Sequence, residues 1–243
     1  MRIQLKLIAA ENEEVTCSLP FDFRRHFISL LKTLLSDSKL YSRFTSEQSG
    51  YSPYVFAVSF NKILTIDTDK KEILIKLPVY MTISSGFYEV ITQIVNSSIK
   101  MRNAPIILGL KIQDVDILPN YKINTNEAEF RINRHAVFRG IEDYLDGSNV
   151  QLLEESINQH TINKFSFFNQ LPFTLQEEYQ LSTIHVMDES NYKKGVCHHY
   201  GGLITTLQGR IYLKANRKTL QFLHDFGIGV RSGQGFGLLE VIK

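Results

Sequence analysis

The sequence GIGVRSGQGFG, residues 227–237, contains five glycines in eleven positions and decides how the end of the chain folds. Residues 217–226 before it show a helical pattern, and an apolar, strand-like run at 238–242 follows it. Glycine adopts left-handed backbone conformations and lets another chain approach closely, because it has no side chain. We therefore expect a helix, a glycine loop and a terminal strand, with backbone amides open to a polyanion.

Two common glycine motifs are excluded by the order of elements. A dinucleotide-binding loop needs a strand before the glycines and a helix after them, and here the order is reversed. A Walker phosphate loop ends in Gly-Lys-Ser or Gly-Lys-Thr, which residues 227–237 lack. A simple tight connection between elements remains an alternative interpretation.

The form G-h-G, five residues, G-F-G, with h apolar, resembles the C-terminal signature of the RAMP superfamily. It is most similar to that of the CRISPR repeat-RNA processing endoribonucleases. The strand-like residues 1–10, the Leu19-Pro20 step, the stretch AVFR at 136–139 and the helical pattern at 152–165 are also similar to features of this family. The resemblance covers the whole chain loosely and residues 227–242 tightly. It implies two tandem ferredoxin-like (RRM-like) halves.

The composition is that of an ordinary soluble globular protein, with 43% hydrophobic and 21% charged residues. A net charge of only +2 excludes a generally basic nucleic-acid binder, so a local basic face would be needed. Cys17 and Cys197 form no C-x-x-C pair, which favours reduced thiols. No apolar run approaches the roughly 20 residues of a membrane span. We expect a cytoplasmic protein without a membrane partner.

The pattern of elements predicts an α+β fold of two βαββαβ halves, each an antiparallel sheet with helices on one face. The predicted domains are residues 1–119 and 127–243, with 120–126 as a hinge. No internal sequence repeat supports the duplication. The predicted strands are 2–9, 54–60, 72–77, 104–112, 129–138, 180–187, 203–214 and 238–242, and the predicted helices are 22–35, 87–99, 152–165 and 218–226.

The resemblance implies a metal-independent endoribonuclease, in which the substrate's own 2′-hydroxyl attacks the adjacent phosphate. Such a reaction needs a base for the 2′ proton, an acid for the leaving oxygen and cations for the phosphorane. Many family members keep a histidine just after the first helix, supported by a tyrosine in that helix and a nearby lysine. This chain has LYSRFTSE at 40–47, without histidine, and Lys32 at the tyrosine position.

His26, on the first predicted helix, is the nearest substitute for the missing base, because histidine has a pKa near neutrality. Its place beside Phe27 is equally that of a packed or solvent-facing histidine. Lys32, Tyr41 and Arg43 could form a cationic cleft that assists catalysis without a histidine. An exposed helix lysine is the simpler interpretation of Lys32.

RNA contacts are predicted for the second half of the chain. Lys193-Lys194-Gly195 is expected at a hairpin or loop tip that grips RNA phosphates, or as a plain solvated turn. Cations of this kind hold the RNA backbone, while a few base contacts set the sequence choice. Singly, each is equally an ordinary surface cation. The predicted RNA-binding residues are Arg134, Arg139, Lys193, Lys194, Arg210, Gly227, Gly229, Arg231, Gln234, Gly235 and Gly237.

The run Cys197-His198-His199 suggests a metal site, but adjacent residues of a strand point to opposite faces and seldom bind one ion together. We therefore expect neither a metal nor a cofactor.

Three functions follow from these patterns. The first is an endoribonuclease that binds CRISPR repeat RNA and cuts the precursor transcript (pre-crRNA) to release guide crRNAs. The second is a catalytically inactive repeat-RNA-binding subunit of a CRISPR effector complex, which the missing histidine favours. The third is a nucleotide-binding regulatory domain of ferredoxin-like fold. Effector-complex subunits and a second copy of the chain, in a homodimer, are candidate protein partners.

Overall fold

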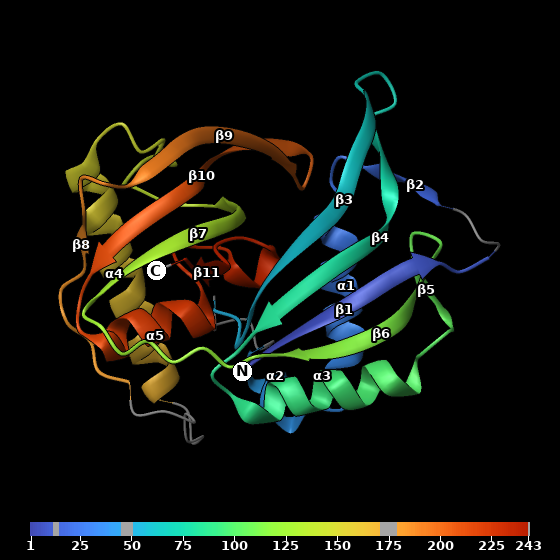
Figure 1. Cartoon of the computed structure of the whole chain (residues 1–243), viewed down its shortest axis with the longest axis horizontal. Helices are drawn as coiled ribbons and strands as arrows, with labels where there is room; N and C mark the ends of the chain where they lie inside the picture. Colours follow the sequence, from blue (N-terminus) through green and yellow to red (C-terminus); the bar gives the residue numbers. More distant parts are fainter. Residues whose placement is uncertain (12–14, 45–50, 171–178, 243) are drawn as a thin grey trace.

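The computed structural model describes residues 1–11, 15–44, 51–170 and 179–242. Two antiparallel β-sheets lie side by side, each with its own helices (Figure 1). All strands of the first sheet come from residues before 119, and all strands of the second come from residues after 126. The predicted α+β class with two tandem ferredoxin-like halves is confirmed.

The first sheet has the strand order β2-β4-β1-β6-β5, and β3 also pairs with β4. Strands β6-β1-β4-β3 with helices α1 and α3 make the βαββαβ unit. Ile3 and Leu5 alternate along β1 and are fully buried in one core with Phe27 of α1 and Ile91 of α3. The elements of this half are β1 (Arg2–Ala9), β2 (Thr16–Pro20), α1 (Arg24–Leu34), α2 (Lys39–Phe44), β3 (Val55–Asp67), β4 (Glu72–Ser84), α3 (Tyr88–Lys100), β5 (Pro105–Ile107) and β6 (Leu110–Leu118).

The second sheet has the order β11-β7-β10-β8, with β9 paired to β10, so that β7-α4-β9-β10-α5-β11 repeats the same unit. Its core contains Phe130 of β7, Ile211 of β10, Leu153 of α4 and Leu220 of α5, all fully buried. The elements are β7 (Glu127–Ala136), α4 (Val150–Asn169), β8 (His185–Val186), β9 (Asn191–His199), β10 (Gly202–Lys214), α5 (Arg217–Phe226), the 3-10 turn η1 (Ser232–Gln234) and β11 (Leu239–Val241).

Aromatic side chains join the two halves into one core. The ring centroids of Phe168 in α4 and Phe226 in α5 lie 4.7 Å apart, and both rings contact Phe87 of the first half, at 5.3 and 5.4 Å. Such pairs stabilise a core beyond their buried area. The segment predicted as a hinge is tied down as well, because the side chain of Gln221 in α5 accepts the backbone N–H of Ile123 at 2.9 Å.

The structure corrects the prediction most clearly at β9. Residues 193–195, expected at a hairpin or loop tip, lie within this strand, and residues 200–201 form the tip of the β9–β10 hairpin. β9 is an edge strand that is exposed along much of its length, so its sequence lacks the apolar alternation that identifies a half-buried strand. The strand predicted at 180–187 is only two residues long, and β2 was not predicted.

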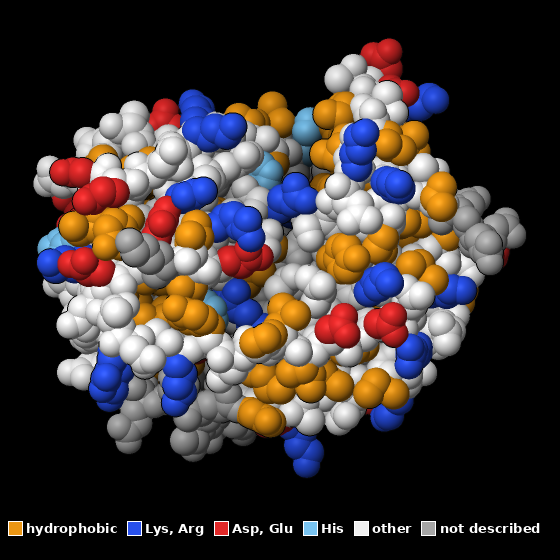
Figure 2. All heavy atoms as spheres, in the orientation of Figure 1, with side chains coloured by type: hydrophobic (Ala, Val, Ile, Leu, Met, Phe, Trp, Pro, Cys, Tyr) orange, Lys and Arg blue, Asp and Glu red, His pale blue; other side chains and the backbone are white. Residues whose placement is uncertain are grey.

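The surface is hollowed where the two halves meet. In the upper centre of Figure 2, histidine and arginine or lysine side chains are visible inside this hollow. In the described ranges, no helix combines the length and the apolar character needed to cross a membrane.

Candidate functional site

The glycine segment 227–237 packs between the halves. Gly237, with φ +80°, donates its N–H to the carbonyl of His135 at 2.8 Å and accepts the N–H of Ile228 at 2.9 Å. A Cβ on Gly237 would overlap the Ile228 carbonyl, and one on Gly229 would overlap that of Val137. All five glycines of the segment are buried. The expected open loop is therefore corrected: glycine is needed because backbones pass close to one another. Direct glycine–RNA contact stays a prediction.

The turn formed by residues 231–234, which includes η1, carries the polar side chains of the segment. Arg231, in a left-handed conformation with φ +62°, donates to the hydroxyl of Tyr144 at 2.6 Å and to Oε1 of Gln234 at 2.8 Å. The same Oε1 accepts Nε2–H of His199 at 2.8 Å. This network fixes the position of a half-buried guanidinium before any ligand binds.

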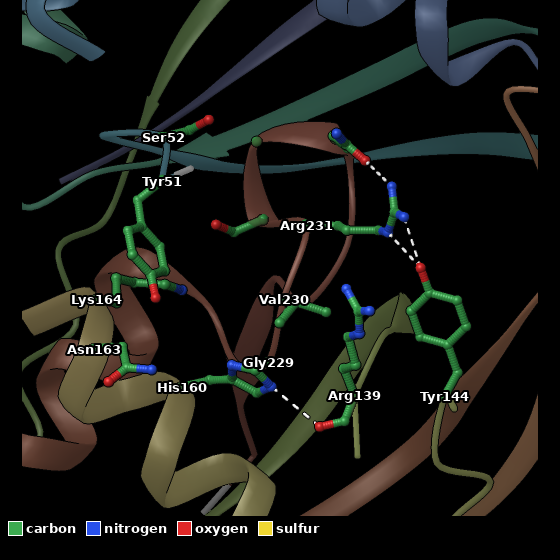
Figure 3. A pocket seen from close by; sticks show the side chains of 13 residues that line it. Tyr51, Ser52, Arg139, Tyr144, His160, Asn163, Lys164, Gly229, Val230 and Arg231 are labelled. Carbon is green, nitrogen blue, oxygen red and sulfur yellow. Dashed lines mark hydrogen bonds between the residues drawn. The ribbon is translucent and has the colours of Figure 1, made fainter. Parts of the chain in front are cut away.

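A cavity of about 590 Å³ lies beside this network, at the junction of the halves (Figure 3). Its volume is within the range of sites that hold small ligands. In Figure 3, Arg231 and Arg139 lie on one side of the cavity, and Tyr51 and Lys164 lie on the other. The lining residues are Tyr51, Ser52, Arg139, Tyr144, His160, Asn163, Lys164 and residues 229–234.

Helix α4 contributes a buried lysine and a histidine to this cavity. Lys164 donates to the carbonyls of Phe226 and Gly227, at 3.2 and 3.1 Å, and so caps the C-terminal end of α5. Its side chain is deeply buried, which lowers the pKa of its ammonium group to about 7. His160 contacts the carbonyl of Arg139 through Nε2 at 3.2 Å, and burial lowers the pKa of this imidazole below its ordinary value.

Three of the residues predicted to be catalytic are not among those that line the cavity. His26 is half-buried on α1, its Nε2 lies 3.4 Å from Nε of Arg25, and burial lowers its pKa. Lys32 is exposed in the last turn of α1, and Tyr41 is buried in the core of the first half. Arg43 lies in α2, and its side chain is outside the described part of the chain. Their catalytic roles stay predictions.

Among the predicted RNA-binding cations outside the glycine segment, Arg139 lines the cavity. Arg134 lies over the ring of Phe60, 5.7 Å from its centroid, and donates to the carbonyl of that residue at 3.3 Å. The remaining three cations lie on β9 and β10. Lys193 is exposed, whereas Lys194 and Arg210 each pair with an acidic side chain, at 3.5 and 3.4 Å. Exposed ion pairs contribute little stability, so these side chains remain able to exchange partners.

The tip of the β9–β10 hairpin contacts the chain just before α1. The ring of His198 lies 4.9 Å from the ring of Phe21. His199 is buried, and its Nδ1 is 3.9 Å from Oδ1 of Asp22. His198 therefore packs against an aromatic ring, whereas His199 is buried beside a carboxylate. Within the described ranges, no group of three or more His, Cys, Asp or Glu side chains is arranged to hold a metal ion.

Acidification is expected to destabilise the protein through His135, at the end of β7. Burial first, and then the charges of Arg24 and Arg134, lower the pKa of this imidazole from 6.5 to about 3. Between these values the unfolded chain binds a proton that the folded protein does not, so the free energy of unfolding falls by about 1.4 kcal/mol per pH unit on acidification. Urea denaturation at pH 6.5 and pH 5 should show a loss roughly 2 kcal/mol larger for the wild type than for His135→Asn. Equal losses would contradict this assignment.

The sequence did not lead to the α4 residues that line the cavity, although its pattern carries a signal for one of them, Lys164. Its buried stripe runs through Leu153, Ile157, Thr161, Lys164 and Phe168. A lysine within such an apolar stripe is rarely buried without a partner, and here its partners are the backbone carbonyls at the end of α5. His160 has no comparable signal in the sequence, because it lies outside the buried stripe and its partner is a backbone carbonyl of a distant segment.

Two ferredoxin-like halves that enclose a cationic cavity beside a C-terminal glycine segment define a protein of the RAMP type. Residues 9–241 match the model of the family described as "CRISPR associated protein Cas6, C-terminal". The chain belongs to this family, and the resemblance drawn from its sequence is confirmed.

Solved structures show the same fold at low sequence identity. An RAMP protein described as binding different RNA substrates is similar over all of both chains, with a TM-score of 0.75 and 19% identity. The product of a Cas6-related gene from Pyrococcus furiosus has a TM-score of 0.76 and 19% identity, over all of this chain and 98% of that one. A Thermus thermophilus Cas6 in a product complex has a TM-score of 0.65 and 15% identity, over 99% of each chain. A comparison with curated protein sequences gives no match.

Proposed function

We propose that this protein binds CRISPR repeat RNA and cleaves the precursor transcript to release guide RNAs. Family membership supports the substrate class. The observation that carries the proposal is the cavity at the glycine segment, where Arg139 and Arg231 line one space together with a histidine. Two guanidinium groups in one cavity suit a phosphate group, because arginine binds phosphate oxygens with a planar fork of N–H donors.

The reaction begins with attack of a ribose 2′-hydroxyl on the adjacent phosphorus. The bond from phosphorus to the 5′ oxygen breaks, which leaves a 2′,3′-cyclic phosphate and a 5′-hydroxyl. This chemistry proceeds without a metal where a base takes the 2′ proton and fixed cations stabilise the added negative charge of the phosphorane. Tyr144 and Gln234 hold Arg231 in one orientation, so little reorganisation is needed when that charge develops.

A second function, an RNA-binding subunit that does not cleave, is favoured by one observation. Residues 40–47 contain no histidine, although the resemblance expects one just after the first helix. In that case the same cavity would bind a phosphate of the repeat without reaction, and other subunits of an effector complex would be the partners.

Cleavage of a cognate transcript separates the two functions. The substrate is an RNA with two repeats and one spacer, taken from the genome that encodes this chain, incubated with purified protein in EDTA. We expect one cut per repeat and a 2′,3′-cyclic phosphate end. A 2′-deoxy nucleotide at the cut site should stop cleavage and spare binding. An uncut RNA that stays bound in a gel would support the non-cleaving subunit, and the absence of binding would contradict both functions.

A further inference from the structure

Helix α4 holds His160 in a fixed position on the wall of the cavity. Ser156, one turn earlier, donates its hydroxyl to the carbonyl of Arg139 at 3.0 Å. Lys164, one turn later, donates to the carbonyls of Phe226 and Gly227. The residues before and after His160 thus fasten this face of α4 both to the segment after β7 and to the start of the glycine segment. A group held on a rigid element in this way is suited to precise chemistry.

The partner of His160 determines which ring nitrogen carries the proton. Nε2 lies 3.2 Å from the carbonyl oxygen of Arg139, and a carbonyl oxygen only accepts hydrogen bonds. Nε2 therefore carries the hydrogen, and in the neutral ring Nδ1 keeps its lone pair. Figure 3 shows Nδ1 on the opposite edge of the ring from this bond. The ring is neutral near pH 7, because burial lowers its pKa.

Other histidines near the junction are less suited to accept a proton from a ligand. The side chain of His199 is 1% exposed, and its Nε2 is occupied by Gln234. His135 bonds to Thr206 at 2.8 Å, and its low pKa makes it a weak base. His26 lies on α1 beside a cation. Within the described ranges, His160 is the histidine that lines the cavity.

The same cavity supplies positive charge. The guanidinium of Arg231 is fixed by Tyr144, and Arg139 contributes a second, exposed guanidinium from the residue whose carbonyl holds His160. The backbone carbonyl of Arg139 therefore holds His160 in the same cavity that the Arg139 side chain lines. A base and two cations that converge on a space of nucleotide size are the groups that 2′-hydroxyl attack requires.

We propose that His160 is the general base of the cleavage reaction and that Arg139 and Arg231 bind the phosphate at the cut site, an inference that rests on the proposed function. Nδ1 of His160 takes the proton of the 2′-hydroxyl while the 2′ oxygen forms its bond to phosphorus. The bond from phosphorus to the 5′ oxygen breaks, and the 5′ oxygen takes a proton from water in the open cavity. The proton on His160 then returns to solvent.

His160→Gln tests the role of the ring while a donor to the Arg139 carbonyl is retained. Under single-turnover conditions, with the two-repeat RNA, we expect the cleavage rate to fall by about 10²- to 10⁴-fold. The dissociation constant for the 2′-deoxy RNA should change by less than about twofold, because the arginines remain. Added imidazole should restore part of the activity of His160→Ala. His185→Gln is the matched control, since His185 is an exposed histidine that contacts Glu154 of the same helix, and it should cleave at the wild-type rate.

The outcomes separate this inference from the proposed function. If the wild type binds the repeat RNA and does not cut it, the endoribonuclease itself is contradicted and no base is needed. If the wild type cuts and His160→Gln cuts at the same rate, only the assignment of His160 is overturned. Loss of cleavage in His26→Ala, with full activity in His160→Gln, would assign the base to α1.

Discussion

Replacing Gly237 with alanine is expected to lower the free energy of unfolding by more than about 4 kcal/mol, which is exceptional for one substitution. Its φ of +80° alone costs alanine about 1–2 kcal/mol. In addition, the new Cβ would overlap the carbonyl of Ile228, a backbone atom that cannot rotate away. The hydrogen bond that Gly237 donates to the His135 carbonyl and the one that it accepts from the N–H of Ile228 would be lost as these backbone segments separate. Urea denaturation of the purified variant measures the effect.

Gly109→Ala is the matched control for this substitution. Gly109 also has a positive φ, +69°, but a Cβ there would meet nothing within 4 Å. We expect a loss of only about 1–2 kcal/mol, the cost of the left-handed conformation. Equal losses in the two variants would show that backbone conformation, and not the close approach of the Gly237 and Ile228 backbones, explains the glycine at position 237.

Arg231→Ala is expected to weaken binding of the 2′-deoxy repeat RNA by roughly 10- to 100-fold, because a charge-assisted contact to a phosphate contributes about 1.5–3 kcal/mol. The guanidinium is held in place by Tyr144 and Gln234, so little side-chain entropy is lost on binding. The slope of log affinity against log salt concentration should decrease in magnitude by about 0.7, the value for one phosphate contact to a single strand. Fluorescence anisotropy over a range of salt concentrations measures both quantities.

Arg102→Ala removes the same charge from another part of the surface. Arg102 follows α3 and pairs with Asp114 of β6 at 2.7 Å, and it does not line the cavity. Its loss should change the affinity by less than about twofold. If both variants bind equally well, the cavity is not the place where this protein meets the RNA backbone.

Much of the fold could be predicted, because the spacing of apolar residues along the sequence and the family resemblance indicate the same elements. The strand at 2–9 alternates cleanly, and β1 covers these same residues, because one face of it packs against helices. The predicted helix at 87–99 is within one residue of α3 at each end. β9 was missed for the opposite reason, since a largely exposed edge strand needs no apolar face.

The site was predicted only in part, because its geometry depends on contacts between distant segments. Arg231 and Gln234 could be found from the glycine motif, and Arg139 from the family-like AVFR stretch. His160 could not, because its partner is a backbone carbonyl that no residue type reveals. The glycines were found but given the wrong surroundings, since a loop that is open and a loop that is threaded between two sheets have the same composition.

A structure of the protein bound to repeat RNA with a 2′-deoxy nucleotide at the cut site would test most directly whether the RNA lies in the cavity between the halves. We predict that the phosphate at the cut site lies within hydrogen-bonding distance of Arg139 and Arg231, with the 2′ position facing His160. RNA bound on the outer face of either sheet, with the cavity free of nucleotides, would contradict this.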